Sequence, residues 1–336
     1  MQPLPIILIH KWYQSYLEYS ILQAKKFNAE SEIYLIWDSA NKFLWNKLWV
    51  KHLLISDFEE SIQDINKSYK HLSGNSYQYE LFCFQRWFIL RDFANKNNYD
   101  KFIYIDSDIL LYTNVSDEII RFNKIMDFDL AYVWSSWHTS YFNNQQSISD
   151  FCEFILDYYK DNKKLDYLER FFSEYSKIQT TWWVSDMYLF WIYKSVNPKI
   201  FNISEIIWWS IYDANFNSTL GNYDFGSLFP DFFKDFDFNP VTFKPFLNSK
   251  KIILKNWHVY WFLHWTKEVA IKFNTLHLQG FSKSYMRYFY NEQFIRLKIN
   301  IFIHYIIEII YSNSKIIRYL RKSYKHIYEK IIFKGI

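Results

Sequence analysis

The sequence predicts an α/β fold built on a mostly parallel sheet with helices on both of its faces. Short segments rich in Ile, Leu, Phe and Tyr alternate along the chain with longer segments whose apolar residues recur at helical spacing. Strands and helices that alternate in this way form parallel sheets, because each helix carries the chain back to the start of the next strand. Such sheets bind ligands at the carboxyl ends of their strands, so polar residues there are the first functional candidates.

Each expected element has its own pattern. The strands are short apolar runs bounded by turn residues, and the helices place apolar side chains on one side, as Leu17, Ile21 and Ala24 do in the first of them. Beyond about residue 200 the chain is aromatic and rich in loops. The expected strands are 4–9, 32–36, 53–58, 101–112 and 129–133, and the expected helices are 14–28, 79–96, 147–159, 164–175 and one that opens at Asp186.

Composition narrows the classes of function. A net charge of +4 over 336 residues is too small to indicate a nucleic-acid-binding protein. Two cysteines, Cys83 and Cys152, are too few for a disulfide framework and fit buried thiols in a reducing compartment. The start of the chain does not resemble a signal peptide, and no run of about 18 apolar residues predicts a membrane span. We therefore expect a cytoplasmic protein.

Two aspartates interrupt the apolar run K-F-I-Y-I-D-S-D-I-L-L-Y at residues 101–112. In a strand, residues i and i+2 point the same way, so Asp106 and Asp108 are expected to project together, with Ser107 turned away. Two carboxylates at the end of a buried strand need a cation, and oxygen ligands suit Mg²⁺ or Mn²⁺. The triplet also occurs in phosphatase and calcium loops, although the Gly that continues those loops is absent here, and a surface pair without a role stays open.

His10 and Asp38 follow the first two expected strands. If those strands are parallel neighbours, both residues lie at the same edge as the aspartate pair, where one ligand could contact them all. We therefore expect them to bind the ligand. The alternative for His10 is a strand-end residue half exposed to solvent.

The helix, the strand and the paired aspartates together resemble nucleotide-sugar-dependent glycosyltransferases of the GT-A fold. The resemblance rests on Q-R-W-F-I-L-R-D-F at 85–93 and I-Y-I-D-S-D-I-L-L-Y at 103–112. A further segment, L-H-L-Q-G-F-S-K at 276–283, is similar to the H-x-x-G-x-x-K element of retaining glycosyltransferase family 8. The Pro-Trp that often follows that lysine is replaced by Ser284-Tyr285, which leaves the donor, the retention of configuration and membership of a neighbouring group open.

The resemblance implies a metal site and a diphosphate site. His277 would join Asp106 and Asp108 around Mn²⁺ or Mg²⁺, and Gly280 and Lys283 would hold the diphosphate. Donor contacts would also include His10, Asp38 and Ser107.

Two further residues receive catalytic roles on this resemblance. Arg86 would reach the donor through its forked guanidinium, unless it pairs with Asp92 or Glu80 on the surface of its helix. Asp186 would act near the junction of sugar and acceptor, as a general base in an inverting enzyme or by orienting the donor in a retaining one. Its alternative role is to cap a helix. His138 and His258 would line the acceptor cleft, although their spacing does not require it.

The reaction that the resemblance implies moves a sugar from a nucleoside diphosphate, with UDP-hexose as the expected donor, to a saccharide or glycolipid acceptor in cell-surface polysaccharide synthesis. Two rivals remain. A sugar-nucleotide nucleotidyltransferase needs a Gly-rich phosphate loop near the first strand, which His10-Lys11-Trp12 does not supply even with Gly at position 12. A non-catalytic sugar- or membrane-binding protein would have a degenerate site, and the set of Asp106, Asp108 and His277 argues against that.

The last part of the chain differs in character. We expect residues 1–290 to form the glycosyltransferase domain and residues 291–336 a helical, basic tail, with nine Lys and Arg against three Glu. Apolar residues recur at helical spacing along 299–310 and 316–331. This pattern fits a basic amphipathic helix on an anionic membrane, which would make the protein peripheral at the inner face of the cell membrane. A helical hairpin packed on the core is the alternative.

The chain is poor in glycine and rich in tryptophan, with 5 Gly and 15 Trp. Many tryptophans stand where turn or loop sequence would favour glycine, so we hypothesise that they are UGA codons that the source organism reads as glycine. Reading all of them except Trp87 this way brings glycine to an ordinary content. The positions are Trp12, Trp37, Trp45, Trp49, Trp134, Trp137, Trp182, Trp183, Trp191, Trp208, Trp209, Trp257, Trp261 and Trp265.

Overall fold

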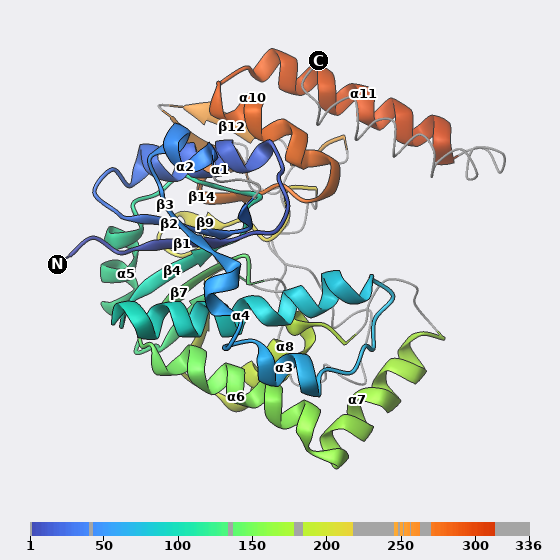
Figure 1. Cartoon of the computed structure of the whole chain (residues 1–336). Helices are drawn as coiled ribbons and strands as arrows, with labels where there is room; N and C mark the ends of the chain where they lie inside the picture. Colours follow the sequence, from blue (N-terminus) through green and yellow to red (C-terminus); the bar gives the residue numbers. More distant parts are fainter. Residues whose placement is uncertain are drawn as a thin grey trace. The chain divides into compact units, whose positions relative to one another are not determined.

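The computed structural model describes two compact units that interleave along the chain (Figure 1). Unit 1 comprises Met1–Trp12, Glu30–Asp106 and Val115–Asn202, and unit 2 comprises Tyr13–Ala29, Ser107–Asn114 and Ile203–Ile336. The expected separation of 1–290 from 291–336 is a different division and stays a prediction. The described residues are 2–39, 43–133, 137–177, 184–217, 245–247, 249–250, 252–255, 257–262 and 270–312.

A seven-stranded sheet forms the centre of unit 1, in the order β3-β2-β1-β4-β7-β6-β8. Strands β1, β2, β3 and β4 run parallel, as do β6 and β8, whereas β7 is antiparallel to both of its neighbours. The predicted α/β class with a mostly parallel sheet is therefore confirmed. The bounds are β1 Ile6–Ile9, β2 Ile33–Trp37, β3 Lys51–Leu54, β4 Phe102–Ile105, β6 Leu130–Tyr132, β7 Thr139–Phe142 and β8 Ile200–Asn202.

The helices of unit 1 follow capping and burial rules that the sequence carries. The longest, α4 (Tyr77–Asn97), begins where the Ser76 side chain accepts from the Tyr79 N–H and ends at Asn98, which is left-handed. It packs beside α6 (Gln146–Lys160), as Figure 1 shows. The others are α2 Phe43–Leu48, α3 Gln63–Ser68, α5 Val115–Asn123, α7 Asn162–Tyr175 and α8 Asp186–Val196.

Unit 2 is built around a second sheet in the order β12-β13-β14-β5, with β9 pairing in parallel to β14. Its core joins residues from distant parts of the chain, among them Leu110, Phe273 and Met286. The strands are β5 Ile109–Leu111, β9 Ser210–Tyr212, β12 Ile252–Lys255, β13 His258–Phe262 and β14 Ala270–His277, with a small hairpin of β10 Pro245–Phe246 and β11 Ser249–Lys250. The helices are α1 Tyr16–Phe27, the 3₁₀ helix η3 Gly280–Tyr285, α10 Met286–Tyr290 and α11 Phe294–Ser312.

The expected single strand over 101–112 is wrong. Strand β4 ends at Ile105 and β5 begins at Ile109, with a turn between them. The two strands belong to different sheets, since β4 pairs with β1 and β7 whereas β5 pairs with β14. Asp106 and Asp108 therefore do not share one face of a strand, because charged side chains within a doubly buried strand would lose their hydration.

The expected strand over 53–58 is also misplaced. Strand β3 spans Lys51–Leu54, and Ile55–Phe58 forms a 3₁₀ turn, η2. Asp57 explains the change, because its carboxylate accepts from the Leu54 N–H at 3.2 Å and closes the turn. Strand β7 was not expected, since Thr139 and Ser140 lower the apolar character of a segment that the sheet nevertheless buries.

A carboxylate at the start of β2 gives a pH-dependent test of the fold. Glu32 accepts hydrogen bonds from Tyr34 Oη at 2.6 Å and Tyr99 Oη at 2.9 Å and pairs with Lys51. The Lys51 ammonium, helped by the Tyr34 hydroxyl, lowers the pKa of Glu32 to about 2 from the ordinary 4.5. Its contribution to stability is therefore fully present above the ordinary pKa and is lost as pH falls towards about 2.

We expect Glu32→Gln to flatten the pH dependence of the free energy of unfolding between these two values, because the variant has no carboxylate to protonate. Urea midpoints measured at steps across that range check this. Glu30→Gln, at an exposed position nearby, is the control. A wild type and a Glu32→Gln variant with parallel pH profiles would contradict the assigned interaction.

Candidate functional site

Three neighbouring parallel strands of unit 1 end at the same edge of the sheet. His10 follows β1, Asp38 follows β2 and Asp106 follows β4, in agreement with the positions expected from the sequence. Asp38 Oδ2 accepts from the Trp12 N–H at 2.8 Å, so this carboxylate ties the turn after β1 to the end of β2. The edge at which ligands bind in such sheets thus carries an imidazole and two carboxylates.

A single guanidinium joins two carboxylates in unit 1. Arg86, on α4, donates from Nη1 to Asp106 Oδ1 at 3.0 Å and from Nη2 to Asp186 Oδ2 at 2.7 Å. The Tyr104 hydroxyl also donates to Asp106 Oδ1. The Arg86 side chain is only 13% exposed, which makes these charge-assisted hydrogen bonds stronger than surface pairs. The hydrogen bond from Arg86 to Asp186 joins residues that are 100 positions apart in the sequence.

Asp186 is buried, and both oxygens of its carboxylate accept hydrogen bonds at this site. Trp87 Nε1 donates to its Oδ2 at 2.8 Å, and the Met187 N–H donates to its Oδ1 at 3.0 Å. Asp186 is the first residue of α8, but the N-cap is Ser185, whose side chain accepts from the Tyr188 N–H. The alternative that Asp186 itself caps the helix is therefore wrong.

The alternative partners of Arg86 are occupied elsewhere. Asp92 pairs with Lys96 at 3.0 Å, and Glu80 accepts from Ser73 and Asn75. Burial lowers the pKa of Arg86, but Tyr104, Asp186 and Asp106 raise it by more, so the guanidinium stays charged. One positive charge shared by two carboxylates leaves a net negative charge among the described residues of this cluster.

A second cluster lies in unit 2 and contains Asp108, His277 and Lys283. His277 is the last residue of β14, and its Nε2 lies 3.5 Å from Asp108 Oδ1. Lys283, in η3, places Nζ 3.1 Å from Asp108 Oδ2 and 3.4 Å from Tyr16 Oη. The pairing of β14 with β5 brings His277 close to Asp108, because His277 stands opposite Ile109, the residue after Asp108.

The orientation of the His277 ring is fixed by its neighbours. Nδ1 lies 2.7 Å from the Ala214 carbonyl oxygen, which can only accept, so Nδ1 carries the proton. The His277 N–H donates to Asp213 Oδ2 at 3.0 Å. Nε2 then faces Asp108 Oδ1 at 3.5 Å, an approach that is satisfied either by a proton on Nε2 or by a metal cation between the two atoms.

The charges of Asp108 and Lys283 stabilise each other. Burial raises the pKa of Asp108, but Lys283 and His277 lower it by more, so its pKa falls below the usual range. Burial lowers the pKa of Lys283, and Asp108 and Tyr16 raise it by more. Lys283, expected to contact a diphosphate, thus already serves as the counter-ion of a buried carboxylate.

The structure places two of the three expected metal ligands together. Asp108 and His277 belong to unit 2 and supply an oxygen and a nitrogen, whereas Asp106 belongs to unit 1 and bonds to Tyr104 and Arg86. Within the described ranges, no group of three or more His, Cys, Asp or Glu side chains is arranged to hold a metal ion. The oxygen and nitrogen donors present fit Mn²⁺ or Mg²⁺ as part of a site that needs further ligands.

Two further candidates are sequence neighbours of the second cluster: Ser107 precedes Asp108, and Gly280 lies between His277 and Lys283. Gly280 opens η3 with φ +57°, a conformation that other residues adopt only with strain, and nothing lies within 4 Å of the place that a β-carbon would take there. Open space at a glycine suits close approach of a ligand to the backbone. Ser107 is buried, next to Asp108.

The two histidines expected at an acceptor cleft belong to different units. His138 is buried in unit 1, with Nδ1 3.0 Å from Thr139 Oγ1, and its carbonyl oxygen accepts from the Asp106 N–H at 2.7 Å. His258 lies on β13 of unit 2, its ring centroid 5.4 Å from that of Phe27. His138 therefore positions the backbone of Asp106, and no contact with an acceptor follows for either residue.

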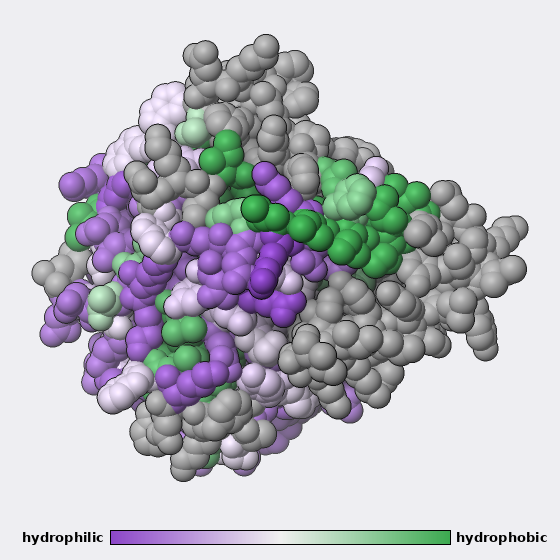
Figure 2. Space-filling view, turned by 90° about the horizontal axis from the view of Figure 1, so that it is seen from above, coloured by the Kyte–Doolittle hydropathy of each residue, from purple (hydrophilic) through white to green (hydrophobic). Residues whose placement is uncertain are grey.

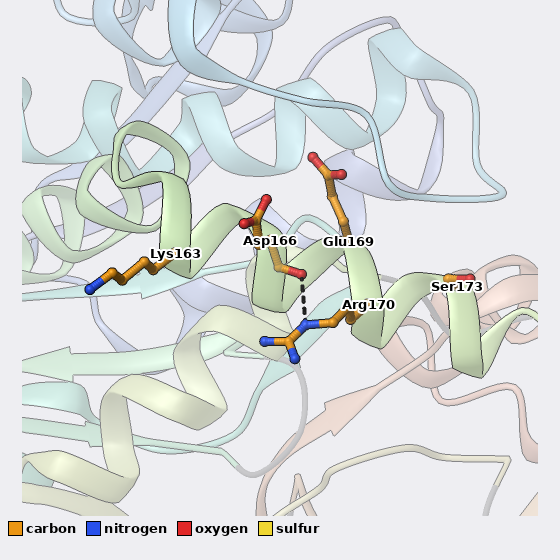
Figure 3. A pocket seen from close by; sticks show the side chains of 5 residues that line it. All are labelled: Lys163, Asp166, Glu169, Arg170 and Ser173. Carbon is orange, nitrogen blue, oxygen red and sulfur yellow. Dashed lines mark hydrogen bonds between the residues drawn. The ribbon is translucent and has the colours of Figure 1, made fainter.

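A surface hollow in unit 1 holds none of the candidate residues. Lys163, Asp166, Glu169, Arg170 and Ser173 line it, all from α7, and Arg170 Nε donates to the Asp166 carbonyl (Figure 3). Mixed charges on one exposed helix are ordinary surface features. We assign no function to this hollow.

Three residues of the two clusters, Tyr104, Trp87 and Asp213, were not predicted from the sequence. Tyr104 precedes Asp106 by two residues at the end of β4, so alternation along that strand would have found it. Trp87 adjoins Arg86 in the matched segment and could have been found there. Asp213 follows β9 in a region that carried no recognisable pattern, and only the pairing of β9 with β14 brings it to His277.

Similarity to known proteins is confined to solved structures, since no protein-family model and no curated protein matches the chain. Mouse xyloside xylosyltransferase 1, in its apo form, is similar with 10% identity and a TM-score of 0.43 over 69% of this chain and 91% of that chain. The glycosyltransferase GlyE of Streptococcus pneumoniae TIGR4 has 12% identity and a TM-score of 0.35 over 60% of this chain and 45% of its own. The chain thus spans less than half the length of GlyE.

A cytidylyltransferase of Leptospira borgpetersenii serovar Hardjo-bovis is also similar, with 9% identity and a TM-score of 0.31 over 46% of this chain and 65% of that chain. Likeness at these scores assigns neither a family nor an activity. Function is therefore inferred from the residues themselves.

Removal of Arg86 tests the first cluster. We expect Arg86→Met to lower the free energy of unfolding by about 3–5 kcal/mol, because it leaves two carboxylates without their shared cation. Chemical denaturation measures this change. Arg91→Met, one turn further along α4, is the matched control, with an expected loss below about 1 kcal/mol. Equal losses in the two variants would contradict the role assigned to Arg86.

Proposed function

We propose that the chain is a metal-dependent glycosyltransferase that moves a sugar from a nucleoside diphosphate to an acceptor hydroxyl. The observation that supports this most directly is the convergence of Asp108 and His277, with Asp108 Oδ1 and His277 Nε2 3.5 Å apart and Lys283 beside them. Asp108 and His277 are far apart in the sequence, and the resemblance to the H-x-x-G-x-x-K element implies that they meet.

The surroundings of His277 support a role as a metal ligand. Its Nδ1–H is donated to the Ala214 carbonyl, as ligating histidines donate their second ring nitrogen to a fixed acceptor. Asp106 lies two residues from Asp108 in the sequence, and the Cα atoms of such residues are at most about 7 Å apart. We assign Asp106 as the third protein ligand on this basis.

A bound Mn²⁺ or Mg²⁺ would stabilise the negative charge that develops on the departing diphosphate. Lys283 has two tasks in this proposal. Without ligand it neutralises Asp108, and once another cation does so its ammonium is available to the diphosphate. Gly280, with open space around it, lets the start of η3 approach the same phosphate oxygens.

We assign Arg86 and Asp186 of the first cluster to the sugar, as the resemblance implies. Arg86 fixes the carboxylates of Asp106 and Asp186, so that Asp186 presents a charged group in one orientation. This carboxylate either orients the donor sugar in a retaining reaction or accepts the acceptor proton in an inverting one. His10, Asp38 and Ser107 complete the donor contacts.

The proposed donor is a UDP-hexose, and the proposed acceptor is a saccharide or glycolipid in cell-surface polysaccharide synthesis. This choice, like retention of configuration, rests on the family 8 resemblance. A nucleotidyltransferase would need a phosphate loop after β1, and the turn there is instead bound by Asp38. A non-catalytic sugar-binding protein would have no need of the Asp108–Lys283–His277 contacts.

Titration with UDP in the presence and absence of Mn²⁺ tests the proposal. We expect binding that requires the metal, and we expect Asp108→Asn to weaken it by at least about 100-fold, since an amide removes a ligand charge from the site. Calorimetry measures the affinities, and circular dichroism checks that the variant folds. Asp150→Asn, at an exposed position on α6, is the control. UDP binding indifferent to Mn²⁺ would favour the non-catalytic alternative.

Lys283→Met separates the two tasks of this lysine. We expect Mn²⁺ alone to bind about ten-fold more tightly, because the competing cation at Asp108 is gone, and UDP with Mn²⁺ to bind more weakly. Lys272→Met, on β14, is the control. A variant in which both affinities fall together would contradict the exchange of partners.

We propose in addition that α11 lies on an anionic membrane surface. Its Leu297 and Ile301 are buried in the core of unit 2, whereas its outer face is apolar and exposed, with Ile295 79% and Phe302 53% accessible. This band is visible in Figure 2. Among the α11 side chains that the structure describes, the exposed apolar ones are Ile295, Ile299, Phe302, Ile303, Ile306 and Ile309.

The residues that follow α11 in the sequence indicate what binds its apolar face. Residues 313–336, which lie outside the described residues and include the second predicted apolar stripe, contain seven Lys and Arg against Glu329. An apolar face followed by positive charge matches the acyl boundary and headgroups of an anionic bilayer. No helix in the described ranges is long and apolar enough to cross a membrane, so the proposal is a surface contact.

We expect the full chain to pellet with vesicles that contain phosphatidylglycerol and to remain in solution with phosphatidylcholine alone. Ile299→Gln with Phe302→Gln should reduce pelleting about ten-fold or more, because two large apolar groups no longer enter the bilayer. Val196→Gln, at an exposed apolar position on α8, is the control. Unchanged pelleting of the double variant, or a dimer in sedimentation that the double variant abolishes, would overturn the membrane assignment.

A further inference from the structure

Tryptophans occupy most of the left-handed backbone positions of this protein. Nine non-glycine residues of the described chain have a positive φ, and six of them are tryptophans, although tryptophan supplies 15 of 336 residues. Side chains with a β-carbon avoid this region, which is populated mainly by Gly and, less often, Asn or Asp. The φ angles are 66° at Trp12, 52° at Trp49, 49° at Trp137, 48° at Trp208, 62° at Trp209 and 66° at Trp257.

Two of these sites are turns that glycine normally makes. Ile207 and Ser210 exchange both backbone hydrogen bonds, at 2.8 and 3.0 Å, around Trp208 and Trp209. A two-residue turn with positive φ at both positions is the type I′ geometry, in which Gly and Asn dominate. At the second site Lys255 pairs with His258, and the sequence between these two residues is Asn-Trp. Asn-Gly is the strongest signal for such a hairpin.

At three of these sites, positions 49, 137 and 209, the indole is largely exposed or too large for its place. Trp49, directly after α2, is 86% exposed and Trp209 is 67% exposed, so neither buries its ring. Trp137 is buried, but its ring centroid lies 2.7 Å from that of Phe190, whereas aromatic pairs keep their centroids about 4.5–7 Å apart. A side chain too large for its place is the sign of a position shaped for a smaller residue.

We propose that the native protein has glycine at positions 12, 49, 137, 208, 209 and 257, because its source translates UGA codons as glycine. The backbone angles support this independently of the composition that first suggested it. Trp87 is a genuine tryptophan in this proposal, since it lies within α4 and its Nε1 donates to Asp186.

Four other tryptophans of the described chain lack this backbone signature. Trp37, Trp45, Trp191 and Trp261 lie in strands or helices without a positive φ. Trp134, Trp182, Trp183 and Trp265 lie outside the described residues.

Glycine at position 12 would change the proposed binding edge. Residue 12 follows β1 beside Asp38, and the indole of Trp12 is half exposed. Without a side chain, the backbone there is open to close approach by a ligand at the carboxyl ends of β1 and β2. This consequence rests on the proposed function, whereas the glycine assignment does not.

Peptide mass spectrometry of the protein purified from its source organism is the direct test. We expect peptides that span the six positions to have the mass of glycine there, and the peptide that spans Trp87 to keep tryptophan. Tryptophan at the six positions would overturn the proposal, whatever the activity of the protein.

The stability of the tryptophan-containing chain gives a second test. At Trp49, both Trp49→Gly and Trp49→Ala remove an exposed indole, but only glycine removes the strain of the left-handed backbone. We expect Trp49→Gly to have a folded-to-unfolded ratio on the order of five-fold higher than Trp49→Ala, measured from urea midpoints. In the helical control, Trp87→Gly should be less stable than Trp87→Ala. An alanine variant at 49 as stable as the glycine variant would contradict the assignment.

Discussion

Buried or half-buried carboxylates that need a positive partner are the constraint on which both clusters depend. In unit 1 Arg86 provides that partner for Asp106 and Asp186, and in unit 2 Lys283 provides it for Asp108. The cost of removing carboxylates from water is offset in each case by a charge-assisted hydrogen bond. The guanidinium is held by two acids at once, whereas Lys283 is held by Asp108 with Tyr16 as its other contact, so the lysine is the cation more easily drawn to a ligand.

The aspartate triplet stands where the chain passes from one unit to the other. The first unit ends a segment at Asp106 and the second begins one at Ser107. Each carboxylate is therefore oriented by its own neighbours: Asp106 by Tyr104, Arg86 and the backbone of His138, and Asp108 by the pairing of β14 with β5.

Much of this arrangement could be predicted from local pattern. The apolar runs that became β1, β2 and β4 and the helix with Arg86 were recognisable from period and length, and so was the edge at which His10, Asp38 and Asp106 lie. The break between β4 and β5 was not, because an apolar run does not reveal which sheet each half will join. Contacts such as Arg86 with Asp186 and His277 with Asp213 depend on pairings across 100 and 64 residues, and no local rule contains them.

The tryptophans show how local inconsistency can itself be informative. A sequence that specifies its fold places residues that suit the backbone at each turn, and bulky rings at left-handed positions depart from that rule repeatedly. Glycine at these six positions restores agreement between turn geometry and residue type, with no change to the residues of either cluster.

Crystals grown with UDP and MnCl₂, and measured near the manganese absorption edge, test the central claim most directly. We predict an anomalous peak about 2.0–2.3 Å from a carboxylate oxygen of Asp108 and from His277 Nε2, with the Lys283 ammonium displaced towards the diphosphate. A peak remote from both side chains, or UDP bound with the Asp108–Lys283 pair intact and no manganese, would contradict it.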